Sequence, residues 1–304
     1  MITLRLKLLL ITTSLFMVIG LPVAAQTVTP TPIPADATAE ATAEATVDPS
    51  QVELLTPEII STRPHDPKAW TEGLLLQDGY LYESVGENGH SSVRKVDPMT
   101  GDVVQQFDMG KDDYAEGIAI VGDKLLQMTY KQEIVYQYDW KTLKQLPGTL
   151  SYKGEGWGLT YDSDLDVLWM SNGEPALFKR DPKTFDIIER IPVTLQGLSI
   201  DTITAGGRSL GGLNELEVVG DVIYANIWPA TFILRIDKAT GFVTGIIDGS
   251  KLLPPDAPIT ADARQYLNGI AYDAEHDTFL ITGKYWPYTF EVKWKSEGMM
   301  TKLR

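Results

Sequence analysis

Five short segments of the 304-residue chain place a chemically active residue directly before a glycine or glutamate that is followed by an aliphatic residue. Two of these segments carry a carboxylate that can transfer protons, one carries an indole, and two carry an amide that both donates and accepts hydrogen bonds. A mixture of carboxylates, amides and aromatic rings is typical of a small-molecule pocket. The residues at this variable position are Glu72, Glu116, Trp157, Asn214 and Asn268.

The same five segments indicate a structural repeat, because each opens a stretch rich in aliphatic and aromatic residues. They return at intervals of about 40 to 60 residues, and a unit of that length suits four short strands. The chain after residue 50 has no long helical periodicity. The sequence therefore predicts an all-β domain of five similar units, which open at Glu72-Gly73-Leu74, Glu116-Gly117-Ile118, Trp157-Gly158-Leu159, Asn214-Glu215-Leu216 and Asn268-Gly269-Ile270.

A second strand is predicted in each unit, where a β-rich run follows a turn of the Gly or Asp type. In a β-propeller the first strand of each blade lines the central channel, and the second strand runs back to the face where the first began. The starts of the first strands and the ends of the second strands should therefore gather at one mouth. The second strands are expected to bring Glu83 and Ser84, Tyr130 and Lys131, Asn172, Asn226 and Trp228, and Lys284 and Trp286.

The β-rich run from Val52 to Ile60 precedes the first unit, whereas the fifth unit stops near Trp294 without its outermost strand. An N-terminal strand that completes the last blade would leave no unpaired edge between the first and last blades. We therefore expect a five-bladed β-propeller closed by an N-terminal strand in the last blade. Two longer intervals place loop insertions at about residues 196–213 and 251–266, on the same face as the motifs, where they could form a lid.

Residues 1–25 are expected to be a secretory signal peptide, because Arg5 and Lys7 precede an apolar run that ends in small residues. An uncleaved membrane anchor is the alternative, which the short run with its Thr and Ser residues disfavours. Residues 26–50 repeat Thr, Pro, Ala and Glu without any large aromatic side chain, so we expect a disordered linker. Residues 51–304 then form the propeller, and the protein is expected to be secreted or otherwise extracytoplasmic.

The formal net charge of −15 disfavours several classes of partner. An acidic surface without a basic cluster repels nucleic acid and anionic lipid head groups. We expect no nucleic-acid partner, no stable membrane insertion after signal cleavage, and a monomer. The chain has no cysteine, so core burial and paired strands have to hold the fold without disulfides.

Nine stretches of the chain, taken together and in order, form a specific pattern. They are His65–Leu74, Tyr82–Ser84, Ser91–Arg94, Glu116–Ile118, Gly156–Thr160, Leu213–Glu217, Ala225–Trp228, Leu267–Ala271 and Thr282–Pro287. This pattern resembles the plant and bacterial type of glutaminyl-peptide cyclotransferase. The resemblance implies a five-bladed propeller that closes N-terminal glutaminyl residues of peptides or proteins to pyroglutamyl residues, with loss of ammonia.

The resemblance also assigns roles to residues near the mouth. Glu116 matches the family's Glu-Gly-Ile/Leu motif, and a carboxyl among aromatic rings should have a raised pKa, so we expect it to be the general acid and base. Lys284 lies in a Gly-Lys-aromatic-Trp-Pro context, where its charge could stabilise the oxyanion or orient Glu116. The substrate-binding residues are expected to be Glu72, Trp70, Tyr114, Tyr130, Trp157, Asn214, Trp228 and Trp286.

Two positions depart from the family pattern. Glu72 stands where the family usually has glutamine, and Tyr130 stands where it usually has tryptophan. A second carboxylate near Glu116 would couple to it, so that one of the pair titrates at high pH. Glu72 could instead hold the substrate ammonium. We expect both departures to affect substrate preference and the pH optimum.

Two other functions are compatible with the same residues. A metal-dependent propeller hydrolase or lactonase would bind a divalent ion through Glu72, Glu116, Asn214 and Asn268, although no histidine lies at a recurring motif to build a zinc site. A non-catalytic peptide-binding propeller would keep the aromatic mouth without needing Glu116. The cyclotransferase interpretation requires no cofactor and no catalytic metal, and it leaves room for a structural divalent ion.

Overall fold

The computed structural model describes residues 47–260 and 263–303, which belong to one compact unit. The expected signal peptide and residues 26–46 of the expected linker lie outside the described residues. Regular structure in the described part is almost entirely β-strand, with two short 3-10 helices, η1 (Ile200–Thr202) and η2 (Ala263–Gln265). The all-β prediction is confirmed. Within the described ranges, no helix has the length and apolar character that spanning a membrane requires.

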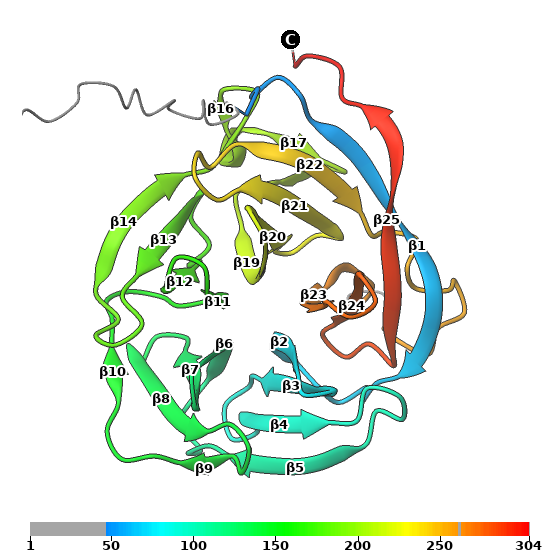
Figure 1. Ribbon diagram of the computed structural model, residues 1–304. Helices are drawn as coiled ribbons and strands as arrows, with labels where there is room; N and C mark the ends of the chain where they lie inside the picture. The colour runs from blue at the N-terminus through cyan, green and yellow to red at the C-terminus, as the bar shows by residue number, and fades with distance from the viewer. Residues whose placement is uncertain (1–46, 261–262, 304) are drawn as a thin grey trace, which may run out of the picture. The chain divides into compact units, whose positions relative to one another are not determined.

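Three sheets follow one another along the chain, and in each the order of strands in space largely follows the sequence (Figure 1). The first comprises β2 (Thr71–Gln77), β3 (Tyr80–Val85), β4 (Ser92–Val96) and β5 (Val103–Asp108). The second comprises β6 (Ala115–Val121), β7 (Lys124–Thr129), β8 (Ile134–Asp139) and β10 (Leu150–Ser151), with β9 (Lys144–Gln145) also paired to β8. The third comprises β11 (Leu159–Asp162), β12 (Val167–Met170), β13 (Ala176–Arg180) and β14 (Ile187–Pro192).

The last large sheet has eight strands in the order β19-β20-β21-β22-β1-β25-β24-β23. Its members are β19 (Leu213–Val219), β20 (Val222–Ile227), β21 (Phe232–Asp237), β22 (Val243–Asp248), β1 (Glu53–Pro64), β25 (Tyr288–Met299), β24 (Thr278–Gly283) and β23 (Leu267–Asp273). β1 lies antiparallel to β25 along its whole length, and at residues 53–55 it also pairs in parallel with β22. The N-terminal strand β1 thus pairs with β25, the last strand of the chain, as a closing strand would.

Five strands lie at the centre of the unit, namely β2, β6, β11, β19 and β23 (Figure 1). Each packs against the next, and β23 packs against β2, so their contacts form a closed ring. These are the strands that the recurring motif was expected to open. Hydrophobic cores fill the space between neighbouring sheets, and the largest includes the buried side chains of Trp169, Leu216 and Ile236.

The recurring glycine is explained by the close approach of the central strands. A Cβ atom on Gly117 would lie 2.5 Å from the backbone nitrogen of Leu159, and one on Gly158 would overlap the backbone of Asn214. Any larger residue at these positions would push neighbouring strands apart. The glycine therefore allows the central strands to pack closely, whereas this packing does not restrict the residue before it.

The fourth unit has Glu215 where the other units have glycine, and this carboxylate joins three central strands. Its oxygens accept hydrogen bonds from the backbone N–H groups of Leu74 at 3.2 Å and Ile270 at 2.9 Å. Glu217, two residues further along β19, accepts a hydrogen bond from the backbone N–H of Tyr272 at 2.8 Å. Burial raises the pKa of both carboxyls, and that of Glu217 to about 8.

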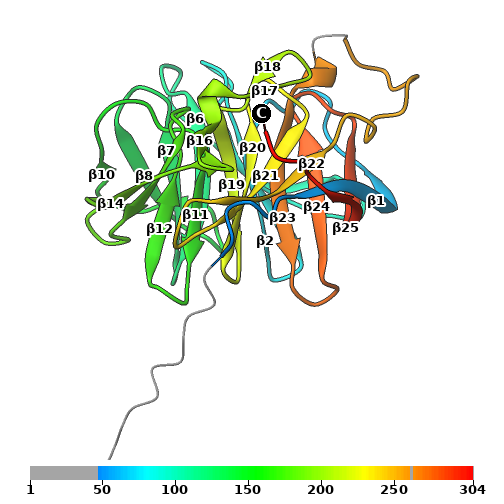
Figure 2. The ribbon, with the colours of Figure 1, turned by 90° about the horizontal axis from the view of Figure 1, so that it is seen from above.

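The two predicted insertions carry the remaining small elements. The first contains two short hairpins, formed by β15 (Thr194–Leu195) with β16 (Leu198–Ser199) and by β17 (Thr204–Ala205) with β18 (Arg208–Ser209). The second contains η2. Figure 2 shows the β17–β18 hairpin and the segment around η2 on the same face of the unit, as the sequence predicts.

The raised pKa of Glu217 makes a prediction about stability. The pKa of Glu217 is about 8 in the folded state and about 4.5 in the unfolded state, so the folded state binds the proton more tightly. This proton binding stabilises the fold fully below pH 4.5, and the stabilisation is lost as the pH rises to about 8. Glu217→Gln should therefore lose less thermal stability than the wild type between pH 5 and pH 8. Melting temperatures at both pH values test this, with the exposed Glu189→Gln on β14 as the control. Equal losses in wild type and Glu217→Gln would contradict it.

Candidate active site

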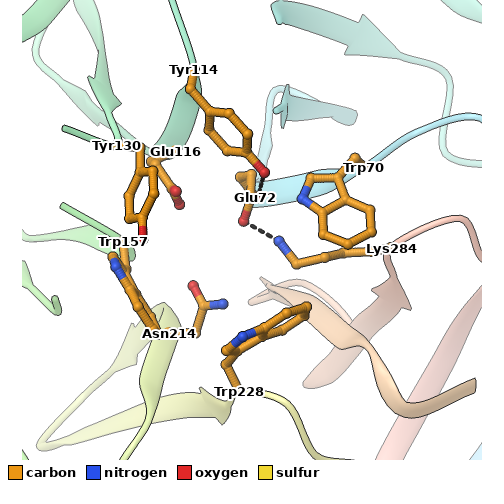
Figure 3. A pocket seen from close by; sticks show the side chains of 9 residues that line it. All are labelled: Trp70, Glu72, Tyr114, Glu116, Tyr130, Trp157, Asn214, Trp228 and Lys284. Atoms are coloured by element: carbon orange, nitrogen blue, oxygen red, sulfur yellow. Dashed lines mark hydrogen bonds and ion pairs between the residues drawn. The ribbon is translucent and has the colours of Figure 1, made fainter. Parts of the chain in front are cut away.

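Nine of the ten side chains expected at the site line one pocket (Figure 3). The cavity has a volume of about 180 Å³. Its walls combine aromatic rings, two carboxyls, one amide and one ammonium group. The lining residues are Trp70, Glu72, Tyr114, Glu116, Tyr130, Trp157, Asn214, Trp228 and Lys284.

In each of the five units, the first strand pairs antiparallel with the second strand, and this pairing brings the lining side chains together. The end of a second strand lies beside the start of the first strand, so residues from both reach the same cavity. The residues near the starts of first strands are Glu72, Glu116 and Asn214. The residues directly after second strands are Tyr130, Trp228 and Lys284.

A buried ion pair joins Lys284 to Glu72, although 212 positions separate them in the sequence. Nζ of Lys284 contacts Oε2 of Glu72, and both side chains are at most 4% exposed. The phenol of Tyr114 donates a hydrogen bond to Oε1 of Glu72 at 3.2 Å. The ammonium also lies 4.9 Å from the ring centre of Trp70 and 5.2 Å from that of Trp228. These contacts offset the cost of removing both charges from water.

Glu116 supplies the second carboxyl of the pocket and is also buried. Its pKa is raised well above the ordinary value, first by burial and then by the charge of Glu72, and the charge of Lys284 only partly offsets this rise. Burial also raises the pKa of Glu72, but the charge of Lys284 and its hydrogen bond favour the ionised form. In this coupled pair, Glu116 therefore holds a proton more strongly than Glu72, whose negative charge lies against Lys284.

Aromatic side chains form the walls on opposite sides of the carboxyls. The rings of Trp70 and Trp228 meet edge to face with their centres 6.0 Å apart. Those of Tyr114 and Tyr130 are tilted, with centres 5.6 Å apart. Trp157 lies next to Tyr130 and Asn214 in Figure 3. Such walls exclude water from a ligand and strengthen the electrostatic interactions inside.

Asn214 presents an unsatisfied acceptor to the cavity. The residue is 4% exposed, and its Oδ1 has no hydrogen-bond partner in the described part of the chain. Figure 3 shows the amide directed into the pocket. A buried acceptor without a donor costs free energy, so a ligand that brings an N–H group to this position would be stabilised.

Trp286 is the predicted site residue that does not line the pocket. Its indole is 1% exposed, donates a hydrogen bond to the carbonyl of Ala263 at 2.8 Å and packs against Phe290. The backbone turns at Tyr285, which has a φ of 61°, directly after Lys284. This turn sends the next side chain into the core behind the pocket.

Six further residues expected at the mouth do not line the pocket either, namely Glu83, Ser84, Lys131, Asn172, Asn226 and Asn268, and one neighbour of the lining residues was missed. Glu83 bonds to His65 at 2.9 Å, and the amide of Asn268 donates to the carbonyl of Thr71 at 2.9 Å. Tyr266, which was not predicted, packs behind Trp228 with ring centres 4.7 Å apart. A signal for Tyr266 existed in the sequence, because an aromatic residue also stands two positions before Glu72 and Glu116.

Among the described residues, no group of three or more His, Asp or Glu side chains is arranged to hold an ion. In the pocket, Lys284 already pairs with Glu72, and the surroundings of Glu116 raise its pKa and so oppose its ionisation. The donor set therefore does not suit a divalent cation, which prefers several ionised oxygen ligands.

Comparison with known proteins is consistent with this chemistry. A family model described as glutamine cyclotransferase matches residues 33–294. The chain belongs to this family. A glutaminyl-peptide cyclotransferase of Arabidopsis thaliana is 33% identical over 239 residues, which cover 78% of this chain and 71% of that protein. The crystal structure of a Myxococcus xanthus glutaminyl cyclase matches with a TM-score of 0.68 and 31% identity, over 81% of this chain and 99% of that one.

The coupling of the two carboxyls gives a prediction for this cyclotransferase. Glu72→Gln removes the charge that opposes ionisation of Glu116 and leaves Lys284 nearby, so the pKa of Glu116 should fall. A titration followed by carboxyl 13C NMR measures the midpoint, with the Glu116 signal identified by its loss in Glu116→Gln. Glu133→Gln, which removes the partner of the exposed Lys153, should leave the midpoint unchanged. An unchanged midpoint in Glu72→Gln would contradict the assignment of charges.

Proposed function

We propose that the protein is a glutaminyl-peptide cyclotransferase that acts through the pocket around Glu116. The observation that carries the proposal is a buried carboxyl with a raised pKa, Glu116, beside the Glu72–Lys284 ion pair, inside an aromatic cavity of a protein from this family. The reaction needs a curled substrate, a stabilised oxyanion and a proton for the leaving nitrogen. The pocket offers a group for each of these needs.

In the proposed mechanism, the neutral α-amine of an N-terminal glutaminyl residue attacks the carbonyl carbon of its own side-chain amide. The new N–C bond produces a tetrahedral oxyanion, which the ammonium of Lys284 stabilises. Glu116 donates its proton to the side-chain nitrogen, the C–N bond breaks, and ammonia leaves. Glu116 then takes the proton released by the attacking nitrogen and returns to its starting state. Atoms and charge balance without a co-reactant.

Substrate positioning is assigned to the remaining lining residues. Oδ1 of Asn214 would accept a hydrogen bond from the side-chain amide of the substrate, which satisfies its unpaired acceptor. The rings of Trp70, Trp157 and Trp228 would hold the substrate's aliphatic carbons and exclude water. Exclusion of water favours attack by the internal amine over hydrolysis of the amide.

We also propose that the architecture is a five-bladed β-propeller. The closed ring of contacts among β2, β6, β11, β19 and β23 supports five blades, with the eight-stranded sheet counted as two blades that β1 joins. In this arrangement β1 is the outermost strand of the last blade.

The biological setting is proposed from the sequence. Residues 1–25 act as a signal peptide, residues 26–50 form a linker, and the mature enzyme works outside the cytoplasm as a monomer without a required cofactor. Its substrates are peptides or proteins that expose an N-terminal glutamine. Chelators should leave the activity unchanged, whereas a metal-dependent hydrolase would be inhibited.

Incubation of the purified protein with a glutaminyl dipeptide tests the function directly. We expect release of ammonia and loss of its mass from the dipeptide. Glu116→Gln keeps the shape of the side chain but removes its proton, so kcat should fall by about 10²- to 10⁴-fold. Glu174→Gln, which breaks an exposed pair with Arg190, is the matched control and should retain full activity. Undiminished ammonia release by Glu116→Gln would favour another mechanism.

A further inference from the structure

A second buried ionic cluster lies behind the pocket, around Glu83 on β3. Oε1 of Glu83 accepts hydrogen bonds from His65 at 2.9 Å and from the hydroxyl of Thr71 at 2.6 Å. Its Oε2 accepts a bond from Arg94 at 2.5 Å. The side chains of His65, Glu83 and Arg94 are at most 7% exposed, and none of them lines the pocket. The mechanism proposed above uses no member of this cluster.

The contacts of His65 define its charge. Nδ1 lies 2.5 Å from the carbonyl oxygen of Trp286, and Nε2 lies 2.9 Å from Glu83. A carbonyl and an ionised carboxylate only accept hydrogen bonds, so both ring nitrogens must donate and the ring is an imidazolium. Although burial opposes the charge, the carboxylate of Glu83 raises the pKa of His65. The charges of Arg94 and His65 in turn overcome burial and hold the pKa of Glu83 well below its usual range.

This imidazolium connects the two segments that supply the ion pair of the pocket. Trp286, whose carbonyl it binds, follows Lys284 by two residues, and the backbone N–H of His65 donates to Pro287 at 2.9 Å. On the other side, Glu83 binds the hydroxyl of Thr71, the residue directly before Glu72. The cluster therefore forms a short, buried bridge between the chain segments that carry the two partners of the ion pair.

We propose that His65 is a positioning residue, which acts through its two N–H donors to hold Lys284 against Glu72. For its effect on the reaction rate, the proposal rests on the cyclotransferase function. Without the bridge, Lys284 moves away from the position where the oxyanion forms. It also moves away from Glu116, whose pKa it lowers.

His65→Gln tests this, because a neutral amide cannot supply the two opposed N–H donors of an imidazolium. We expect kcat for a glutaminyl dipeptide to fall roughly tenfold to hundredfold, as for a small misplacement of a catalytic group, with little change in KM. The NMR titration midpoint of Glu116 should move to higher pH. His276→Gln is the control, because His276 also bonds a carboxylate, Asp273, but is 61% exposed. It should match the wild type in both measurements.

Two milder variants test the same proposal if His65→Gln does not fold. Thr71→Val removes the hydroxyl that Glu83 binds, whereas Thr71→Ser keeps it. Thr71→Val should reproduce both changes in part, and Thr71→Ser should restore the wild-type values. A folded His65→Gln, or a folded Thr71→Val, with the wild-type Glu116 midpoint would overturn the proposal. This titration needs no turnover, so it tests the role of His65 even if the wild type forms no pyroglutamyl product. The absence of that product would refute only the proposed function.

Discussion

The buried contact between Lys284 and Glu72 determines how the rest of the site behaves. Removing two opposite charges from water is costly, and the ion pair persists only with well-placed partners. Tyr114 and the indole faces of Trp70 and Trp228 provide these partners. Once Glu72 holds its charge, a second charge nearby is disfavoured, so the proton stays on Glu116. A single electrostatic arrangement thus prepares both an acid and a cation for the proposed reaction.

The ring of central strands is what allows this pair to form. The two partners come from β2 and from the end of β24, the first and last sets of strands in the chain, and they meet because β23 packs against β2. Small residues such as Gly117 and Gly158 let the central strands approach closely. Glu215 on β19 reaches to backbone N–H groups of β23 and of β2, the next strand of the ring. Stability and the geometry of the pocket therefore depend on the same closure.

The carboxylate at position 72 sets the electrostatics of the pocket. A glutamine there, as the resemblance led us to expect, would leave Lys284 without a carboxylate partner and would not raise the pKa of Glu116. With Glu72, the positive charge is partly neutralised, and the acid is weaker. In addition to the ion pair with Glu72, the buried cluster of His65, Glu83 and Arg94 keeps Lys284 in place. Two ionic clusters, one facing the cavity and one behind it, share the same two chain segments.

The sequence alone determined the β-strands, the closure by the N-terminal strand and the nine side chains that line the pocket, because these follow from a local repeat and from the family's motifs. Strand periodicity and turn residues are local properties that a sequence displays directly. Only the tertiary structure decided that Trp286 faces the core, that Tyr266 backs the pocket, and that Glu83 turns away to bind His65. Side-chain direction at the end of a strand depends on the backbone turn there and on partners distant in sequence, such as Ala263 for Trp286. Which carboxyl keeps the proton was likewise decided by burial and by Lys284, since a pKa reflects the complete surroundings of a group.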